Sequence, residues 1–110
     1  MAQIANIAID QGTTFSTTIS VTLADGTVRD LTGYTFRSQM RKSYYTNTYI
    51  AFTCTAPTPA NGEIILSLTD TQTTAIKAGR YLYDLEIVSP ASVVERIVEG
   101  IITVYPEVTK

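Results

Sequence analysis

The chain contains no histidine, no tryptophan and one cysteine, and only 16% of its 110 residues are charged. Without histidine, the commonest base that activates a serine or cysteine nucleophile is missing, and a zinc site would have at most one sulfur ligand. The carboxylates are scattered, and the six glycines stand singly, so neither a calcium site nor a phosphate-binding loop is apparent. We therefore expect a protein that is not an enzyme and has no metal or cofactor.

The single cysteine and the N-terminal segment bear on where the protein is made. Cys54 has no partner for a disulfide within the chain, so no oxidising compartment is implied. Its ordinary role is a small buried hydrophobic side chain, and the alternatives are an intermolecular bridge or a reactive thiol. No basic segment precedes an apolar run at the N-terminus, and no apolar stretch approaches the ~18 residues of a membrane span. We expect no signal peptide, no membrane association and synthesis in the cytoplasm.

Threonine takes the place of the missing charge. The chain has nineteen threonines and a formal net charge of −2, which argues against a nucleic-acid partner because such proteins carry basic patches. Threonine is β-branched and suits a pleated, half-exposed surface. A hydroxyl also costs less to desolvate than a charge, so a threonine-rich surface is easily buried against a neighbouring protein.

The clearest pattern is a strict alternation over residues 14–23, with Phe15, Ile19 and Val21 on one face and only serine and threonine on the other. A period of two indicates a strand with one buried face. Similar patterns, separated by turn signals, predict six further strands at 4–9, 34–41, 49–55, 63–68, 80–88 and 93–104. The side chains expected to face the core are Tyr34, Phe36, Ser38, Met40, Ile50, Phe52, Cys54, Ile64, Leu66, Leu68, Tyr81, Tyr83, Leu85 and Ile87.

Two segments depart from simple alternation. Residues 93–104 have a mixed phase and include Gly100, which predicts a bulge or bend in this strand. Residues 70–78 form the only helix-like stretch, of one or two turns, with Thr69 and Gln72 at the spacing of a capping box. Gly79 suits a left-handed residue at the end of that helix.

Seven short strands separated by turns predict one domain, residues 1–110, with an all-β fold: an immunoglobulin-like antiparallel β-sandwich. A turn followed by a strand that begins with tyrosine resembles the E–F corner of such sandwiches, where a tyrosine hydroxyl bonds back to the upstream backbone. Tyr81 and Tyr83 are the candidates. The alternative is that both simply pack within a strand.

Two features are candidates for recognition. The first is a surface formed by Arg41, Lys42, Tyr44, Tyr45 and Tyr49, because tyrosine and arginine are enriched at interfaces. These tyrosines also suit stacking on a sugar, and the plainest alternative is an ordinary exposed hairpin tip. The second is an open sheet edge, which accepts a strand from a neighbour. Residues 4–9 pair either within their own subunit or with another one.

Several segments together resemble a known family, and Asp30-Leu31-Thr32-Gly33 before a strand is the most specific of them. The chain is similar to the N-terminal sandwich domain of tailed-phage upper-baseplate and receptor-binding-protein adaptors. The resemblance extends from Ile4 to Val104. The segments that carry it are 15–23, Asp25-Gly26, 30–37, Asn61 to Ile64, Gly79-Arg80-Tyr81 and Gly100 to Val104.

The resemblance implies a structural protein of a phage virion, in the tail, the baseplate or a fibre adaptor. Its partners would be other virion proteins, and it would be a homo-oligomer or a component present in many copies on a symmetric particle. Capsid decoration is the alternative position in the virion. A carbohydrate-binding module, with Tyr44, Tyr45 and Tyr49 as its platform, is the alternative of another class, and a bacterial adhesin subunit is a more distant one.

Overall fold

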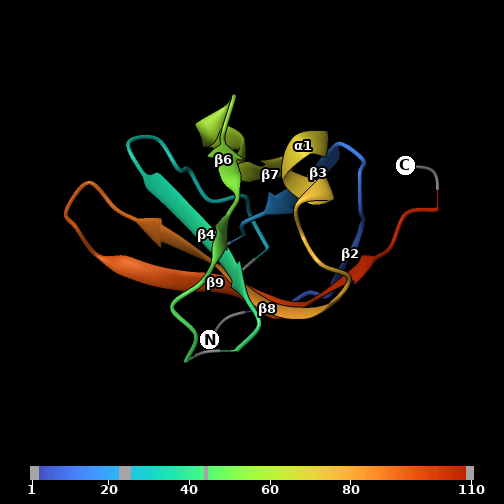
Figure 1. Cartoon of the computed structure of the whole chain (residues 1–110). Coiled ribbons are helices and arrows are strands. Elements are labelled where there is room, and N and C mark those ends of the chain that lie inside the picture. Colours follow the sequence, from blue (N-terminus) through green and yellow to red (C-terminus); the bar gives the residue numbers. More distant parts are fainter. Residues whose placement is uncertain (1–2, 23–25, 44, 109–110) are drawn as a thin grey trace.

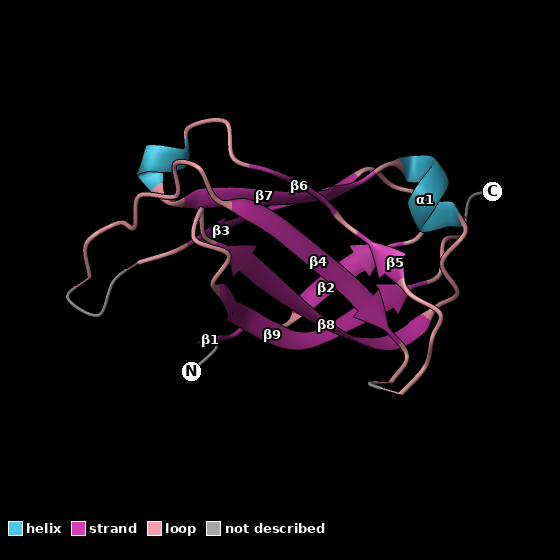
Figure 2. Cartoon of the chain, turned by 90° about the vertical axis from the view of Figure 1, so that its left-hand side faces the viewer, coloured by secondary structure: helices cyan, strands magenta, loops and turns pink. Residues whose placement is uncertain are grey.

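The computed structural model describes residues 3–22, 26–43 and 45–108. Two β-sheets face each other across the core, a six-stranded and a three-stranded one (Figures 1 and 2). The strands in the described residues are β1 (Gln3–Ile4), β2 (Ile7–Asp10), β3 (Phe15–Ser20), β4 (Thr35–Arg41), β5 (Ile50–Ala51), β6 (Thr53–Thr55), β7 (Glu63–Leu68), β8 (Gly79–Val88) and β9 (Val94–Tyr105). The expected all-β sandwich is confirmed.

The strand order is that of an immunoglobulin-like sandwich. The three-stranded sheet has the order β3-β7-β6 and the larger sheet the order β1-β9-β8-β4-β5, which match the B-E-D and G-F-C orders of that fold. All pairs are antiparallel except those of β1 and β2, which run parallel to β9. The sandwich is therefore antiparallel apart from its N-terminal edge, where the larger sheet is mixed.

The inward faces of both sheets form the core, and the strand alternation places them as expected. Strand β3 exposes every second residue, and β7 and β8 bury every second one completely or nearly so. Burying such side chains contributes roughly 1.5–3 kcal/mol each. The buried apolar residues are Ile9, Val21, Leu31, Met40, Phe52, Ile64, Leu66, Leu68, Ile76, Tyr81, Tyr83, Leu85, Ile87, Val98, Ile102 and Val104.

The described residues contain nine strands where seven are expected, because two predicted strands are each divided. The predicted strand 4–9 is interrupted between β1 and β2, which bind successive parts of β9. The predicted strand 49–55 crosses from one sheet to the other: β5 pairs with β4, and β6 pairs with β7. Phe52, at the crossing, is buried between the sheets, and its N–H donates to the carbonyl of Ser38 at 3.0 Å.

The bulge predicted within residues 93–104 is confirmed, and it lies away from Gly100. The register between β8 and β9 shifts beside Leu85 and Glu86, so that Ile97 is the extra residue. Gly100 is in regular pairing with Tyr83. A Cβ atom at Gly100 would lie 2.2 Å from the carbonyl oxygen of Ala5, so the glycine is required by the close approach of the N-terminal segment.

The predicted capping box is confirmed in the short helix α1 (Asp70–Thr74). The hydroxyl of Thr69 accepts from the N–H of Gln72 at 3.2 Å, and the Gln72 side chain accepts from the N–H of Thr69 at 2.8 Å. The prediction that Gly79 ends this helix is wrong, because the helix ends at Thr74 and its C-cap residue, Ala75, has a right-handed conformation. Gly79, with φ of 142°, instead begins β8. A 3-10 turn, η1 (Pro59–Asn61), precedes β7.

The Asp30-Leu31-Thr32-Gly33 segment is a turn that closes one end of the sandwich. The Asp30 carboxylate accepts from the N–H of Thr32 at 2.9 Å and from its hydroxyl at 2.6 Å, and these bonds lower the pKa of Asp30. Leu31 is 1% exposed, and its N–H donates to the carbonyl of Pro59 at 2.9 Å. Gly33 has φ of 82°, which favours glycine. The segment thus positions a core residue and the start of β4.

Candidate protein-protein interface

The two tyrosines considered for the corner have different roles. The hydroxyl of Tyr81 donates to the carbonyl of Lys77, four residues upstream, at 2.7 Å, which is the geometry of a tyrosine corner. The hydroxyl of Tyr83 donates to the carbonyl of Ala5 and so binds the N-terminal segment to the sheet. Burial raises the pKa of Tyr81 and raises that of Tyr83 to about 12. Both hydroxyls are structural donors.

The residues expected to form an interaction surface are only partly brought together. The Arg41 guanidinium lies 5.0 Å from the centre of the Tyr49 ring, a cation–π pair. Lys42 lies elsewhere, with its ammonium 4.5 Å from the centre of the Tyr81 ring, so it contacts the tyrosine corner. Tyr45 is 94% exposed. Tyr44 lies outside the described residues. Tyr45 is therefore the most exposed aromatic side chain among the described residues.

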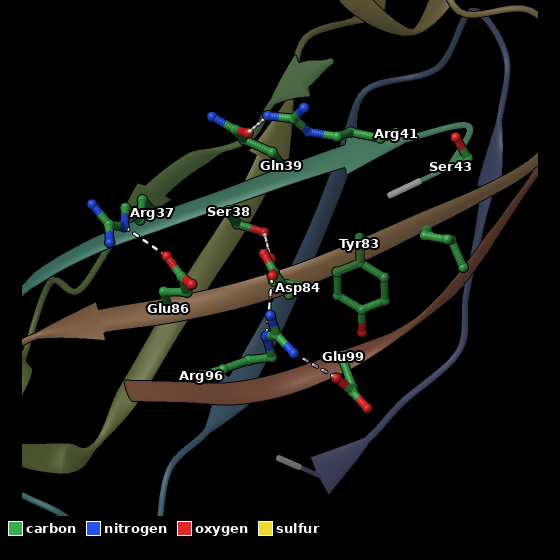
Figure 3. Close-up of a pocket in the computed structure, with 11 residues that line it drawn as sticks. Arg37, Ser38, Gln39, Arg41, Ser43, Tyr83, Asp84, Glu86, Arg96 and Glu99 are labelled. Carbon is green, nitrogen blue, oxygen red and sulfur yellow. Dashed lines mark hydrogen bonds and ion pairs between the residues drawn. The ribbon is translucent and has the colours of Figure 1, made fainter. Parts of the chain in front are cut away.

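Arg41 also borders a groove of about 390 Å³ on the outer face of the six-stranded sheet. The groove crosses β4, β8 and β9, and its walls carry cations and carboxylates in about equal number (Figure 3). Two bonds fix the Arg41 side chain at one end: it donates to the carbonyl of Thr46 at 2.6 Å and to Gln39 Oε1 at 2.9 Å. The charged residues that line the groove are Arg37, Arg41, Asp84, Glu86, Arg96 and Glu99.

Most of these charges are already paired within the chain. Arg37 Nε lies 2.7 Å from Glu86 Oε1, and Arg96 reaches both Asp84 (3.2 Å) and Glu99 (3.3 Å). Burial and the nearby Glu86 charge raise the pKa of Asp84, and Arg96 opposes that shift. Exposed pairs of this kind contribute about 0–1 kcal/mol each. A ligand in this groove would have to compete with these pairs, so the groove favours a broad polar contact over tight capture of one small ion.

The sequence pattern placed these groove residues on outward faces but did not indicate that they form a groove. Arg37, Gln39 and Arg41 alternate on β4, as Asp84 and Glu86 do on β8. The cations of β4 lie opposite the carboxylates of β8 only because these two strands pair in the sheet. Arg37 and Glu86, for example, are bonded to each other although they are 49 residues apart along the chain. The alternation of cations on one predicted strand and carboxylates on another was the available signal.

The outer face of the three-stranded sheet is of another kind. It carries hydroxyl side chains with Ile65 at its centre, and Glu63 is its only charge among the described strand residues. Ser16, Ser67 and Thr53 form one row across the three strands. The hydroxyl residues of this face are Ser16, Thr18, Ser20, Thr53, Thr55 and Ser67.

Cys54 lies at the inner side of β6 and is half-buried. Its thiol donates to the carbonyl of Phe52 at 3.8 Å, and burial raises its pKa. A thiol with a raised pKa is mostly protonated near neutral pH and reacts slowly, because the thiolate is the nucleophile. The geometry therefore favours packing as the role of Cys54.

Comparisons with protein-family models and with curated proteins each found no match to this chain. In the described residues no helix is long and apolar enough to cross a membrane. Within those same residues, no three potential metal ligands of the His, Cys, Asp or Glu type gather at one point.

Proposed function

We propose that this chain is a structural protein of a tailed-phage virion, a tail, baseplate or fibre-adaptor component that acts by binding other virion proteins. The observation that carries this proposal is the 94% exposure of Tyr45, which stands four residues along the chain from both members of the Arg41–Tyr49 pair. Tyrosine and arginine are the residues most often found as energetic anchors of protein interfaces. Covering the Tyr45 ring would contribute roughly 2 kcal/mol.

The position in a phage is supported by the resemblance of the Asp30-Leu31-Thr32-Gly33 segment and its neighbours to phage adaptor domains. In this chain the segment forms a turn that sets the start of β4. Binding by many copies on a symmetric particle would turn weak single contacts into stable attachment, because the effective concentration of a second contact reaches the millimolar range. Capsid decoration is the alternative position that the same contacts would serve.

The test is made on particles purified from a lysate of the host in which the gene is expressed. We expect the chain to band with intact particles in a density gradient, and gold-labelled antibody to mark the tail. Label on the head would favour capsid decoration, and absence of the chain from the particles would contradict the proposal.

A variant then tests the contact itself. Tyr45→Ala should weaken the binding of the chain to particles about thirtyfold, since loss of an interface anchor costs about 2 kcal/mol. Val93→Ala is the control, because Val93 is also exposed (55%) but lies beside β9 at the end away from Arg41. Equal loss for both variants would contradict an interface at Tyr45.

The carbohydrate-binding alternative is tested with the same variant. On one side of Tyr49 the ring faces the Arg41 guanidinium, so a sugar stacked there would have to displace that cation. Saturable binding to a glycan array that Tyr45→Ala abolishes would contradict a purely structural role. We expect no such binding.

A further inference from the structure

Strand β3 forms an edge of the three-stranded sheet and pairs with β7 alone in the described part of the chain. It has six residues, whereas β6 at the opposite edge has three and β5 at the edge of the larger sheet has two. Proteins usually protect an edge by shortening it or by adding charge, proline or a bulge. Strand β3 has none of these and is therefore open to another strand.

One hydrogen bond shows which residues of β3 turn their N–H and C=O groups toward β7 and which turn them toward the free edge. The N–H of Val21 donates to the carbonyl of Gly62 at 2.7 Å, so Val21 faces the β7 side. In an antiparallel pair, successive residues alternate between facing the partner and facing away. The N–H and C=O groups of Ser16, Thr18 and Ser20 consequently point to the free edge.

The inner side of β3 is also incompletely covered. On β7, Ile64 and Leu66 are 0% exposed, whereas Phe15 and Ile19 on β3 are only half-buried although they pack against the same core. A strand laid along the edge would cover them further. Both the backbone and the apolar side chains of β3 thus favour a strand as the missing neighbour.

We infer that this neighbour is β3 of a second copy, paired antiparallel about a two-fold axis at Thr18. In this register Thr18 meets Thr18 and Ser16 meets Ser20 of the second copy, so every edge-facing residue opposes another edge-facing residue. Threonine and serine pairs across strands are favourable, and no like charges oppose each other. A two-fold contact uses the same surface twice, as most homodimers do. The inference rests on the proposed assembly function, for which it names one contact.

Charge variants test the pairing without depending on one mutant. We expect wild-type protein to dimerise with concentration in sedimentation experiments up to about 1 mM. Thr18→Lys and Thr18→Glu should each weaken the dimer at least tenfold, because identical charges meet at the axis, and their equal mixture should restore it. Thr55→Lys, which places the same charge on β6 of the same face, should leave dimerisation unchanged.

Hydrogen exchange locates the contact. The amides of Ser16, Thr18 and Ser20 should gain protection as the concentration rises, and Thr18→Lys should abolish that gain. A wild-type monomer at about 1 mM with these amides unprotected would overturn the inference. Protection that appears only with another virion protein would also overturn it, yet would leave the proposed function intact. Absence of the chain from virions refutes the proposed function whether or not the dimer forms.

Discussion

The two sheets of this sandwich end differently where the chain passes from β2 to β3. In the six-stranded sheet, β1 and β2 bind the outer side of β9 and cover that edge. In the three-stranded sheet, β3 itself is the edge, and no described strand covers it. The comparison shows that the segment formed by β1 and β2 covers the β9 edge of the larger sheet and leaves the β3 edge of the smaller sheet open.

The contacts that hold this segment meet at residues 5 and 6, between β1 and β2. The N–H of Ala5 donates to the carbonyl of Glu99 at 2.9 Å, and the hydroxyl of Tyr83 donates to the carbonyl of Ala5. The Asn6 side chain accepts from the N–H of Ile101 at 3.1 Å. Gly100 leaves the space that this approach needs. Side-chain bonds thus hold the N-terminal segment on the edge formed by β9. On the open edge, the peptide groups of β3 that face outward have no described strand beside them.

The largest effect is expected from proline substitutions on the open edge. Thr17→Pro removes an N–H that faces β7 and should cost about 3 kcal/mol or more of unfolding free energy. Thr18→Pro removes an N–H that faces outward and should cost about 1 kcal/mol or less, because proline is tolerated on edge strands. Urea unfolding of both variants measures the difference. Equal losses of unfolding free energy would contradict the conclusion that the N–H of Thr17 faces β7 and that of Thr18 faces the free edge.

A smaller effect is expected at the covered edge, from Gly100→Ala. The added Cβ would meet the Ala5 carbonyl oxygen at 2.2 Å, so the backbone at Ala5 must shift, and we expect a loss of about 1–3 kcal/mol. The control is a chain from which residues 1–6 have been deleted. In that background Gly100→Ala should cost much less, since the opposing backbone is gone. Additive losses would mean that Gly100 is required for another reason.

Tyr83→Phe tests the hydrogen bond that holds the same edge. It leaves the Ala5 carbonyl without this donor and should cost about 1 kcal/mol. Hydrogen exchange of the Ala5 amide should rise more than that of β3 amides. Tyr81→Phe is the matched control: it loses a bond to Lys77 of similar geometry at the corner, so it should cost about as much without exposing Ala5.

The strand pattern was largely predictable from the sequence, because one face of each strand is buried. The inward sets on β4, β7 and β8 follow directly from alternation, and the capping box of α1 follows from Thr69 and Gln72. The division of residues 49–55 between two sheets was not predictable. Ile50, Phe52 and Cys54 alternate in phase throughout, and only the packing of Phe52 between the sheets reveals the crossing.

The candidate interface was less predictable than the fold. Sequence proximity grouped Arg41, Lys42 and Tyr49, but β4 ends at Arg41 and the two cations then stack on different rings. Gly100 shows the same limit: its environment is set by Ala5, which is 95 residues away along the chain. Contacts between distant segments decide which side chains are available, and alternation alone carries no information about them.

The smallest expected effect concerns the ion pair that links the two sheets near the end of β3. Arg29, whose N–H donates to the Val21 carbonyl, binds Glu95 of β9 through two hydrogen bonds of 2.7 and 3.1 Å. The Arg29 hydrogen bonds lower the pKa of Glu95, so its stabilisation is present above the ordinary pKa of 4.5 and is lost as the pH falls through the lowered value. Because Glu95 is 42% exposed, we expect Glu95→Gln to cost only about 0.5–1 kcal/mol at pH 7. In urea unfolding at several pH values, the difference between wild type and variant should be constant at neutral pH and should vanish in acid. A difference that persists when Glu95 is protonated would mean that the carboxylate charge does not hold the sheets together here.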